Sequence, residues 1–225
     1  MHNRWPGSPA TTERGGRNKL SATAGGLRQT DSTVSEEDLL RADVYDLLAG
    51  VFRREPDAGL LAGLHRIQGD DTPIGRAFAD LAARAGTIGT AKAREEYVDL
   101  FIGLGRGELV PYGSFYLTGF LHEKPLAVLR DDMGRLGIAR AEGVSDPEDH
   151  IAALCEMMAG LIRGRFLEPA PIKLQRAFFE RHIAPWAKHF FSDVEAAKSA
   201  DLYRPAGTIG RLFMEVETAA FGMED

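Results

Sequence analysis

The sequence has very little cysteine: Cys155 is the single one among 225 residues. One cysteine excludes an intramolecular disulfide framework and any metal or iron–sulfur site built from several thiolates, and it suits a reducing, cytoplasmic compartment. No run of 18 apolar residues occurs, so the sequence predicts no membrane-spanning helix. Basic residues number 27 against 33 acidic ones, which argues against nucleic acid as the main partner.

Several catalytic and ligand-binding motifs are also missing. The sequence contains no His-Glu-x-x-His zinc motif, no Gly-x-Ser-x-Gly nucleophile elbow and no Gly-Lys-Ser or Gly-Lys-Thr phosphate loop. The glycine-rich stretch from Gly103 to Gly113 follows an expected helix instead of a strand, which favours a turn over a nucleotide site. The acidic run 146–149 contains a proline that is unsuited to an EF-hand loop. We therefore expect no catalytic reaction, no cofactor and no metal.

The charge is unevenly distributed along the chain. Residues 1–34 carry five basic and two acidic residues, which leaves 22 basic and 31 acidic residues for the remainder, a net charge of −9. The first segment is rich in Gly, Ser, Thr and Asn and is predicted to be disordered. No apolar core of 7–15 residues follows its basic positions, so a secretory signal is not indicated. Its glycines and prolines also spoil the amphipathic helix of a transit peptide. We expect a basic tail over 1–34 and one folded domain over 35–225.

From residue 35 onward, apolar residues recur every three to four positions, the period of an amphipathic helix. Helix starts are predicted at Ser35, with Asp38 as its capping partner, and at Thr72, where a proline follows. Alternating runs of Val, Ile and Thr are missing, so no sheet is expected. The pattern predicts an all-α globular domain of seven to nine helices. The further starts are expected at Thr90, Pro125, Asp146-Pro147, Pro171 and Pro185.

The first candidate binding segment combines aromatic residues with a proline-stiffened loop. It runs from Tyr97 through Phe101 and continues at Pro111–Tyr116. Because loops usually lie at the surface, some of Tyr112, Phe115 and Tyr116 should be accessible and suited to an apolar peptide. The alternative, that these side chains fold the loop back onto the core, stays open.

The second candidate segment is the acidic run that ends in His150. Asp146 is predicted as an N-cap and Asp149 as the third helical residue, completing a capping box. His150 lies in register with an otherwise apolar helix face. Nearby carboxylates favour its protonation, whereas burial opposes it. A hydrogen-bonded core histidine and a polar anchor at the mouth of a peptide groove are both compatible with this pattern.

Taken together and in order, these segments resemble the TorD/DmsD/NarJ family of molybdoenzyme maturation chaperones. The resemblance extends from about residue 36 to the C-terminus. The motifs that carry it are Tyr97-x-x-Leu100-Phe101-x-Gly103, Pro111-Tyr112-Gly113-Ser114-x-Tyr116, Pro147-x-Asp149-His150-Ile151, Leu154-x-x-Met157-Met158 and His182-Ile183-x-Pro185-Trp186.

The resemblance implies an all-helical cytoplasmic chaperone without enzymatic activity. It would bind the twin-arginine signal peptide or the apo form of a molybdenum-cofactor oxidoreductase subunit and delay export until cofactor insertion. Suitable clients are of the formate dehydrogenase or the sulfoxide or amine-oxide reductase type. The resemblance assigns client binding to Tyr97, Leu100, Phe101, Pro111, Tyr112, Ser114, Tyr116, Pro147, Asp149 and His150.

The assignment implies two kinds of contact with a leader, one charged and one apolar. Asp149 and its acidic neighbours are expected to meet the arginines of a leader. The apolar core of the leader is expected to meet Leu100, Phe101, Tyr112 and Tyr116, and a negatively charged body should speed the encounter. Two alternatives stay open: an assembly factor that holds the catalytic subunit without its leader, and a small nucleotide hydrolase. The oligomeric state also stays open, because helical folds of this kind can swap domains.

Overall fold

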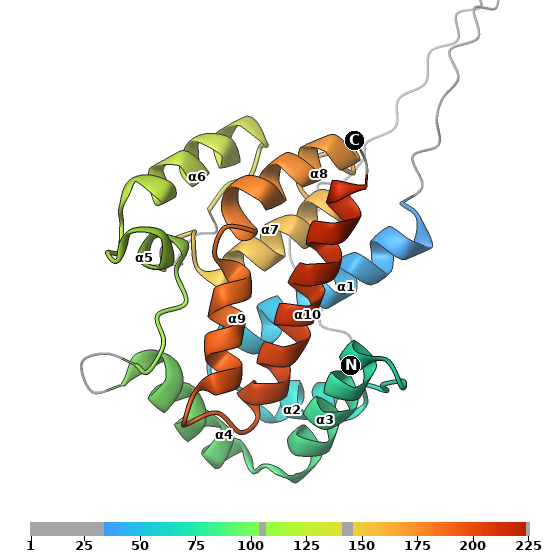
Figure 1. Cartoon of the computed structure of the whole chain (residues 1–225), viewed down its shortest axis with the longest axis vertical. Coiled ribbons are helices and arrows are strands. Elements are labelled where there is room, and N and C mark those ends of the chain that lie inside the picture. Colours follow the sequence, from blue (N-terminus) through green and yellow to red (C-terminus); the bar gives the residue numbers. More distant parts are fainter. Residues whose placement is uncertain (1–33, 104–106, 141–145, 224–225) are drawn as a thin grey trace, which may run out of the picture. The chain divides into compact units, whose positions relative to one another are not determined.

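Helices form all the regular secondary structure in the computed structural model, which describes residues 34–103, 107–140 and 146–223 (Figure 1). No strand occurs in these ranges, which confirms the all-α prediction. The predicted tail over 1–34 lies outside the described residues except for Val34. The α-helices are α1 (Glu36–Phe52), α2 (Ala58–His65), α3 (Pro73–Thr87), α4 (Thr90–Tyr97), α5 (Gly113–Thr118), α6 (Lys124–Arg135), α7 (Ile151–Arg163), α8 (Ile172–Phe178), α9 (Ala187–Ala196) and α10 (Tyr203–Gly222), and the π-helical turns are η1 (Val98–Ile102) and η2 (Phe179–Ile183).

The described ranges therefore contain ten α-helices, one more than the upper end of the expected number. The addition is α5, whose six residues are too few to show a helical repeat in the sequence. None of the described helices combines the length and apolar character needed to cross a membrane. The fold class was thus readable from the sequence, whereas a helix of fewer than two turns was not.

Two predicted helix starts are confirmed in atomic detail. The hydroxyl of Ser35 accepts a hydrogen bond from the backbone N of Asp38 at 3.1 Å. The hydroxyl of Thr72 accepts one from Gly75 N at 3.0 Å, and Pro73 is the first residue of α3. These side chains satisfy backbone donors that have no partner inside the helix.

One predicted helix start is wrong. The helix expected after Asp146 begins only at Ile151, and its N-cap is His150. The histidine Nδ1 accepts a hydrogen bond from Ala152 N at 3.1 Å. The capping box predicted for Asp149 does not form, because its carboxylate bonds to a different loop. A tertiary contact has overridden the local capping signal.

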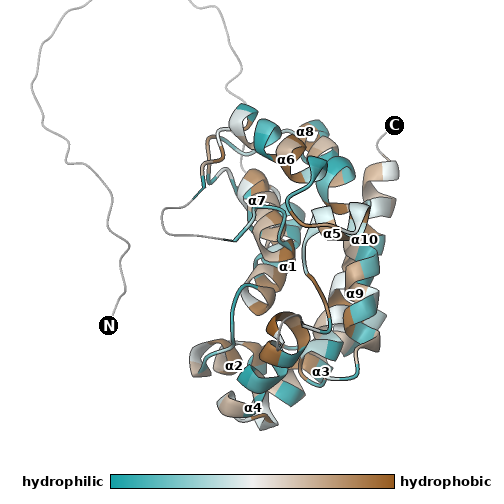
Figure 2. Cartoon of the chain, turned by 90° about the vertical axis from the view of Figure 1, so that its left-hand side faces the viewer, coloured by the Kyte–Doolittle hydropathy of each residue, from teal (hydrophilic) through white to brown (hydrophobic). Residues whose placement is uncertain are grey.

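The core lies between two packed helix pairs. α1 packs along α7, α9 packs along α10, and α3 lies against both α2 and α10 (Figure 1). Figure 2 shows hydrophilic and hydrophobic residues on different faces of α9 and α10, as expected for amphipathic helices. Burying each large apolar side chain contributes about 1.5–3 kcal/mol. The largest fully buried side chains are Trp186, Tyr45, Tyr203, Phe52, Phe179, Phe190 and Phe191.

Two buried carboxylates tie these helices together. Glu217 of α10 is fully buried and accepts hydrogen bonds from Arg41 Nε at 2.7 Å and from the Tyr45 hydroxyl at 2.9 Å. Glu96 of α4 accepts three backbone hydrogen bonds at the start of α10. The donors are Asp201 N, Leu202 N and Tyr203 N, at 2.7–3.1 Å. Both carboxylates meet the requirement that buried charges be hydrogen-bonded.

Candidate functional site

Two loops that are distant in sequence meet beside α7. Tyr112 and His150 form an isolated antiparallel bridge, and their rings lie edge to face with centroids 5.0 Å apart. Ile151 N donates a hydrogen bond to the carbonyl of the buried Pro111 at 2.9 Å. The two candidate segments of the sequence are therefore one structural unit.

Asp149 holds this unit together from the inside. Its side chain is 3% exposed, and its Oδ2 accepts a hydrogen bond from Ser114 N at 2.7 Å. Its carbonyl accepts another from Gly113 N at 2.9 Å. Among the described residues, Asp149 Oδ1 and Ser114 Oγ have no hydrogen-bond partner. The predicted direct contact of Asp149 with arginines stays a prediction, with almost no accessible carboxylate surface to support it.

His150 is held neutral at pH 7. Its pKa is lowered to about 4, chiefly by burial and also by the Arg53 guanidinium, while the carboxylates of Asp146 and Asp149 act in the opposite direction. The sequence left open whether burial or the nearby carboxylates would dominate the pKa of His150. In the structure, burial has the larger effect. The unprotonated Nδ1 is the acceptor that caps α7 through Ala152 N.

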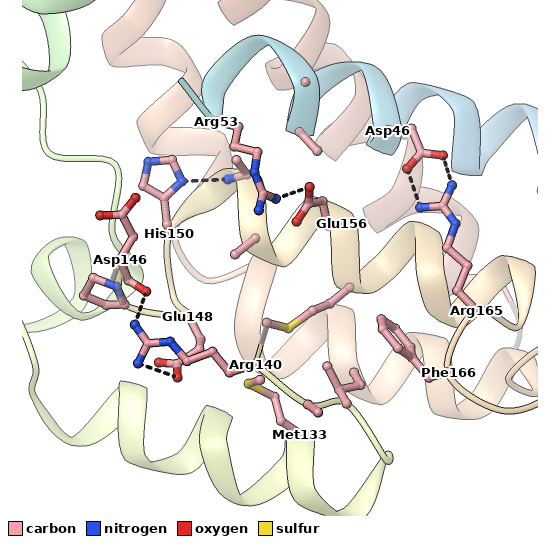
Figure 3. Close-up of a pocket in the computed structure, with 18 of the residues that line it drawn as sticks. Asp46, Arg53, Met133, Arg140, Asp146, Glu148, His150, Glu156, Arg165 and Phe166 are labelled. Carbon is pink, nitrogen blue, oxygen red and sulfur yellow. Dashed lines mark hydrogen bonds and ion pairs between the residues drawn. The ribbon is translucent and has the colours of Figure 1, made fainter. Parts of the chain in front are cut away.

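A cavity of about 620 Å³ lies beside this unit, between α1, α7 and the segments around residues 133–140 and 146–150 (Figure 3). Met133, Met157 and Phe166 provide part of its apolar wall. The charged residues that line it are equally divided between the two signs. They are Asp46, Asp146, Glu148, Glu156, Arg53, Arg54, Arg140 and Arg165.

Three of the four acidic residues in this wall are already neutralised by arginines (Figure 3). The pairs are Asp46 with Arg165 at 2.5 Å, Glu156 with Arg53, and Glu148 with Arg130 at 2.8 Å and Arg140 at 3.5 Å. The fourth, Asp146, is exposed, and only its backbone carbonyl accepts a hydrogen bond from Arg140. The acidity of the whole chain is thus largely compensated at this cavity.

A second concavity of about 460 Å³ adjoins the first, because Arg53 and Arg54 line both. Glu55 and Tyr97 also line it. Burial, together with the carboxylates of Asp146 and Glu55, raises the pKa of Tyr97 to about 12. Within the described part of the chain, neither carboxylate forms an ion pair. We call the two adjoining concavities the groove.

Four of the predicted residues face this groove or border it. Tyr97 lines one part, and Pro147 and His150 line the other. Tyr112 lies next to them: its pKa is raised to about 12 by burial, by the Asp146 carboxylate and by Tyr97. The structure therefore brings these four side chains together across more than 50 residues of sequence.

Leu100 lies in the core behind the groove, and the half-buried Phe101 packs against that core. Leu100 is fully buried. The Phe101 ring packs at 5.1 Å from Tyr97, at 5.8 Å from Phe52 and at 5.3 Å from Tyr203, measured between centroids. The binding role expected for these two residues stays a prediction. They support Tyr97 from beneath.

Ser114 and Tyr116 lie on the other side of the bridge, in α5. The Tyr116 hydroxyl donates to Asp193 at 2.8 Å, and its ring packs on Trp186 and Phe190. Burial and this hydrogen bond raise the Tyr116 pKa above its ordinary value. Neither residue lines the groove.

The end of the glycine-rich stretch has a structural role, while residues 104–106 lie outside the described ranges. A Cβ at Gly107 would come within 2.5–2.7 Å of the backbone of Leu100 and Phe101. Glu108 then accepts hydrogen bonds from Lys198 N at 2.7 Å and Ser199 N at 3.1 Å. Close backbone approach explains this glycine.

Sequence reasoning missed the contribution of α1 to the groove. Arg53, Arg54 and Glu55 follow the last apolar residue of that helix, where the sequence shows only a charged helix end before Pro56. The sequence signal that could have indicated this contribution is the run of three charged residues. Its position opposite residues 146–150 depends on how α1 packs on α7, which the local pattern does not contain.

Metal and thiol chemistry find no support in the described ranges. No group of three or more His, Cys, Asp or Glu residues in those ranges is arranged to hold a metal ion. Cys155 is fully buried, and burial raises the pKa of its thiol.

Comparison with known proteins gives a consistent result. A family model described as nitrate reductase delta subunit matches residues 67–192. The chaperone protein TorD of Vibrio cholerae is 23% identical over 195 residues, covering 78% of this chain and 89% of that protein. A Haemophilus influenzae protein described as the Tat proofreading chaperone DmsD is 31% identical over 112 residues, covering 49% of this chain and 52% of that protein.

A solved structure shares the fold. It is a protein from Archaeoglobus fulgidus described as a redox enzyme maturation protein, with a TM-score of 0.54 and 18% identity. The match covers 84% of this chain and 99% of that one. The family match over more than half of the chain establishes that this protein belongs to the nitrate reductase delta subunit family, which is the TorD/DmsD/NarJ family that its motifs resemble.

Proposed function

We propose that this protein is a cytoplasmic chaperone that binds the twin-arginine leader of a molybdenum-cofactor oxidoreductase in the groove. Binding would delay export until the cofactor is inserted and the client is folded. The relatives support this proposal, because one is named the chaperone protein TorD and another is described as a Tat proofreading chaperone. The clients we propose are of the formate dehydrogenase or the sulfoxide or amine-oxide reductase type.

The observation that carries the proposal is a pair of free carboxylates in a groove whose other facing acids are paired. Asp146 and Glu55 are exposed, and both act electrostatically on Tyr97. Two carboxylates in one groove that have no cationic partner among the described residues suit two neighbouring arginines, because carboxylates and guanidinium groups form charge-assisted, often bidentate, hydrogen bonds. In our proposal Asp146, one of the acidic neighbours that the sequence grouped with Asp149, contacts the arginines together with Glu55.

The walls beside these carboxylates suit the apolar residues of a leader. Tyr97 lines the second concavity together with Ile102, which is 50% exposed, and the Tyr112 ring packs against His150 at the border of the first concavity. Aromatic side chains beside a polar rim are typical of peptide-binding sites. Two adjoining concavities of about 620 and 460 Å³ also offer room for an extended or helical peptide.

Fluorescence anisotropy with labelled leader peptides tests the proposal. One probe carries two consecutive arginines, and a second carries two glutamines in their place. We expect wild-type protein to bind the arginine probe at least tenfold more tightly. The double variant Glu55→Gln/Asp146→Asn should bind it about tenfold more weakly, because two partly exposed charge pairs together contribute about 1–2 kcal/mol.

The matched control is Asp80→Asn/Asp131→Asn, which removes the same net charge from exposed positions of α3 and α6 outside the groove. This control should bind like the wild type. Equal affinity for both peptides, or equal weakening in both double variants, would contradict the proposal. Retention of a leaderless client with undiminished affinity would instead favour the assembly factor that ignores signal peptides.

A further inference from the structure

The first concavity of the groove ends at an aromatic ring. Figure 3 shows Phe166 at the opposite end of this cavity from Asp146 and His150. Met133 and Met157 also line the cavity. Phe166 belongs to none of the motifs that carry the family resemblance. The room at this end of the cavity therefore depends on what holds the ring in place.

The ring lies over a glycine of α7. Glu156 and Met157 face the cavity, and Gly160 is the next residue on the same side of the helix, since residues three and four apart share a face. A Cβ at Gly160 would clash with Phe166 Cε2 and lie only 2.6 Å from its Cζ. The ring thus covers the place that a side chain at position 160 would take, and the two residues share one volume.

The backbone that carries the ring is anchored on both sides of the cavity. Gly164 has a φ of 73°, and Arg165 N donates a hydrogen bond to the Gly160 carbonyl at 2.9 Å, as in a Schellman turn at a helix end. The Arg165 guanidinium then donates two hydrogen bonds to the Asp46 carboxylate of α1, at 2.8 and 2.5 Å. The turn after α7 therefore fixes the position of Phe166 relative to both α7 and α1.

A ring fixed in this way limits the size of a guest. With the ring in place, the cavity ends between Phe166 and the two methionines; without it, the cavity would extend over the next turn of α7. One methylene group more or less in an apolar pocket changes recognition by about 10–200-fold. Side chains too large for a packed site force neighbouring groups out of their preferred conformations.

We propose that Gly160 and Phe166 together set the largest side chain that the groove accepts at this end, which makes them specificity-determining residues for the bound peptide. This proposal rests on the proposed function for the identity of that peptide. A branched aliphatic side chain such as leucine is accepted there, whereas a two-ring side chain such as tryptophan is rejected. Neither residue is assigned this role by the family motifs.

Fluorescence anisotropy with labelled peptides tests this size limit. Each peptide carries two consecutive arginines, and leucine or tryptophan is placed in turn at each of the positions that follow them. At the position that enters the cavity, the wild type should bind the leucine peptide at least tenfold more tightly than the tryptophan peptide. Phe166→Ala should abolish this preference, because space opens over Gly160. Phe166→Ala/Gly160→Leu returns a side chain to the same volume and should restore the preference.

The matched control is Phe78→Ala, which removes another half-buried ring that packs against the core, from α3 outside the groove. This control should keep the preference of the wild type. An unchanged preference in Phe166→Ala, or the same change in Phe78→Ala, would overturn the proposal.

Free indole, the ring system of tryptophan, tests the two residues without any peptide. In ligand-observed NMR titrations, Phe166→Ala should bind indole at least tenfold more tightly than the wild type, and Phe166→Ala/Gly160→Leu should lose that gain. The absence of a gain would overturn the proposal. Failure of the wild type to bind any of the arginine peptides, with the expected indole result, would count against the proposed function and leave the size limit supported.

Discussion

The buried polar groups of the helical scaffold have more complete sets of hydrogen-bond partners than the buried polar groups beside the groove. Glu217 and Glu96 each accept several hydrogen bonds and tie α10 to α1 and α4. At the bridge, Asp149 Oδ1 and Ser114 Oγ have no partner among the described residues, although both are buried.

We interpret this difference as a separation between groups that stabilise the scaffold and groups that belong to the proposed binding site. A scaffold carboxylate with a full set of donors contributes to a single well-defined packing. A buried oxygen without a donor lowers stability and persists where the surrounding structure has another purpose. The unsatisfied atoms lie at the Tyr112–His150 bridge beside the groove, where we expect the client to bind. The following predictions test that contrast.

The largest expected effect is on the scaffold side. Glu217→Ala leaves Arg41 and Tyr45 without their buried partner, and we expect it to reduce the free energy of unfolding by about 3–5 kcal/mol. In a chain of this size the melting temperature should fall by about 10 °C. Thermal and urea unfolding measure both quantities.

The control for this variant is Glu215→Ala on the same helix, where the carboxylate is exposed and paired with Lys188 and Arg211. We expect its effect to stay within about 0.5 kcal/mol, as is usual for surface ion pairs. Equal destabilisation by both variants would contradict the prediction that the buried carboxylate of Glu217 stabilises the protein more than an exposed carboxylate on the same helix.

The second effect concerns His150 and pH. Its pKa is about 4 in the folded protein and near 6.5 when unfolded, so the unfolded state binds more protons between those values. Stability should therefore be full above pH 6.5 and decline as the pH falls toward 4, by about 2–3 kcal/mol at pH 4.5. Urea unfolding at pH 7 and pH 4.5 measures this loss.

The comparison variant is His150→Asn, which keeps an acceptor at the N-cap of α7 but does not titrate. The free energy of unfolding of this variant should fall less steeply as the pH is lowered. The remaining pH dependence includes a contribution from His182, because burial also lowers its pKa. Identical pH profiles for wild type and variant would contradict the lowered pKa.

The third effect separates the two acidic residues at the bridge. Asp149→Ala removes the acceptor of the buried Ser114 N, so we expect a loss of about 1–3 kcal/mol. Asp146→Asn changes an exposed group and should leave the melting temperature within about 1 °C while weakening leader binding. The reverse result, a stable Asp149→Ala that no longer binds the leader peptide, would return the binding role to Asp149.

The smallest effect is kinetic. The association rate of the leader peptide that carries two arginines should fall as salt is raised from about 50 to 500 mM, because screening weakens steering by the groove. The fall should be shallower for Glu55→Gln/Asp146→Asn. Stopped-flow fluorescence measures the rates, and a rate independent of salt would remove electrostatic steering from the account.

The sequence predicted the helical scaffold well, because apolar period and capping residues are local signals. Ser35 and Thr72 cap their helices as expected. The prediction for the start of α7 was wrong because the Asp149 carboxylate accepts a hydrogen bond from Ser114 N. This partner lies 35 residues away in sequence and competes with local capping. A contact of that kind leaves no periodic trace in the sequence.

The candidate site was predicted only in part, because some of its residues belong to sequence motifs and others are brought in by tertiary packing. Tyr97, Tyr112 and His150 were named from their motifs, and the structure brings them together. Arg53 and Glu55 were missed because their chemistry becomes visible only when α1 lies against α7. Charge balance at the groove also depends on these tertiary pairs, which the net charge of the chain does not reveal.

The most direct test of the central claim is binding of whole client precursors to the full-length protein. Precursors of the formate dehydrogenase, sulfoxide reductase and amine-oxide reductase types are each titrated with and without the leader by biolayer interferometry. Our account predicts that at least one precursor binds, and that removing its leader, or changing Glu55 and Asp146 together, weakens that binding at least tenfold. A leaderless client that binds as tightly as its precursor would contradict it.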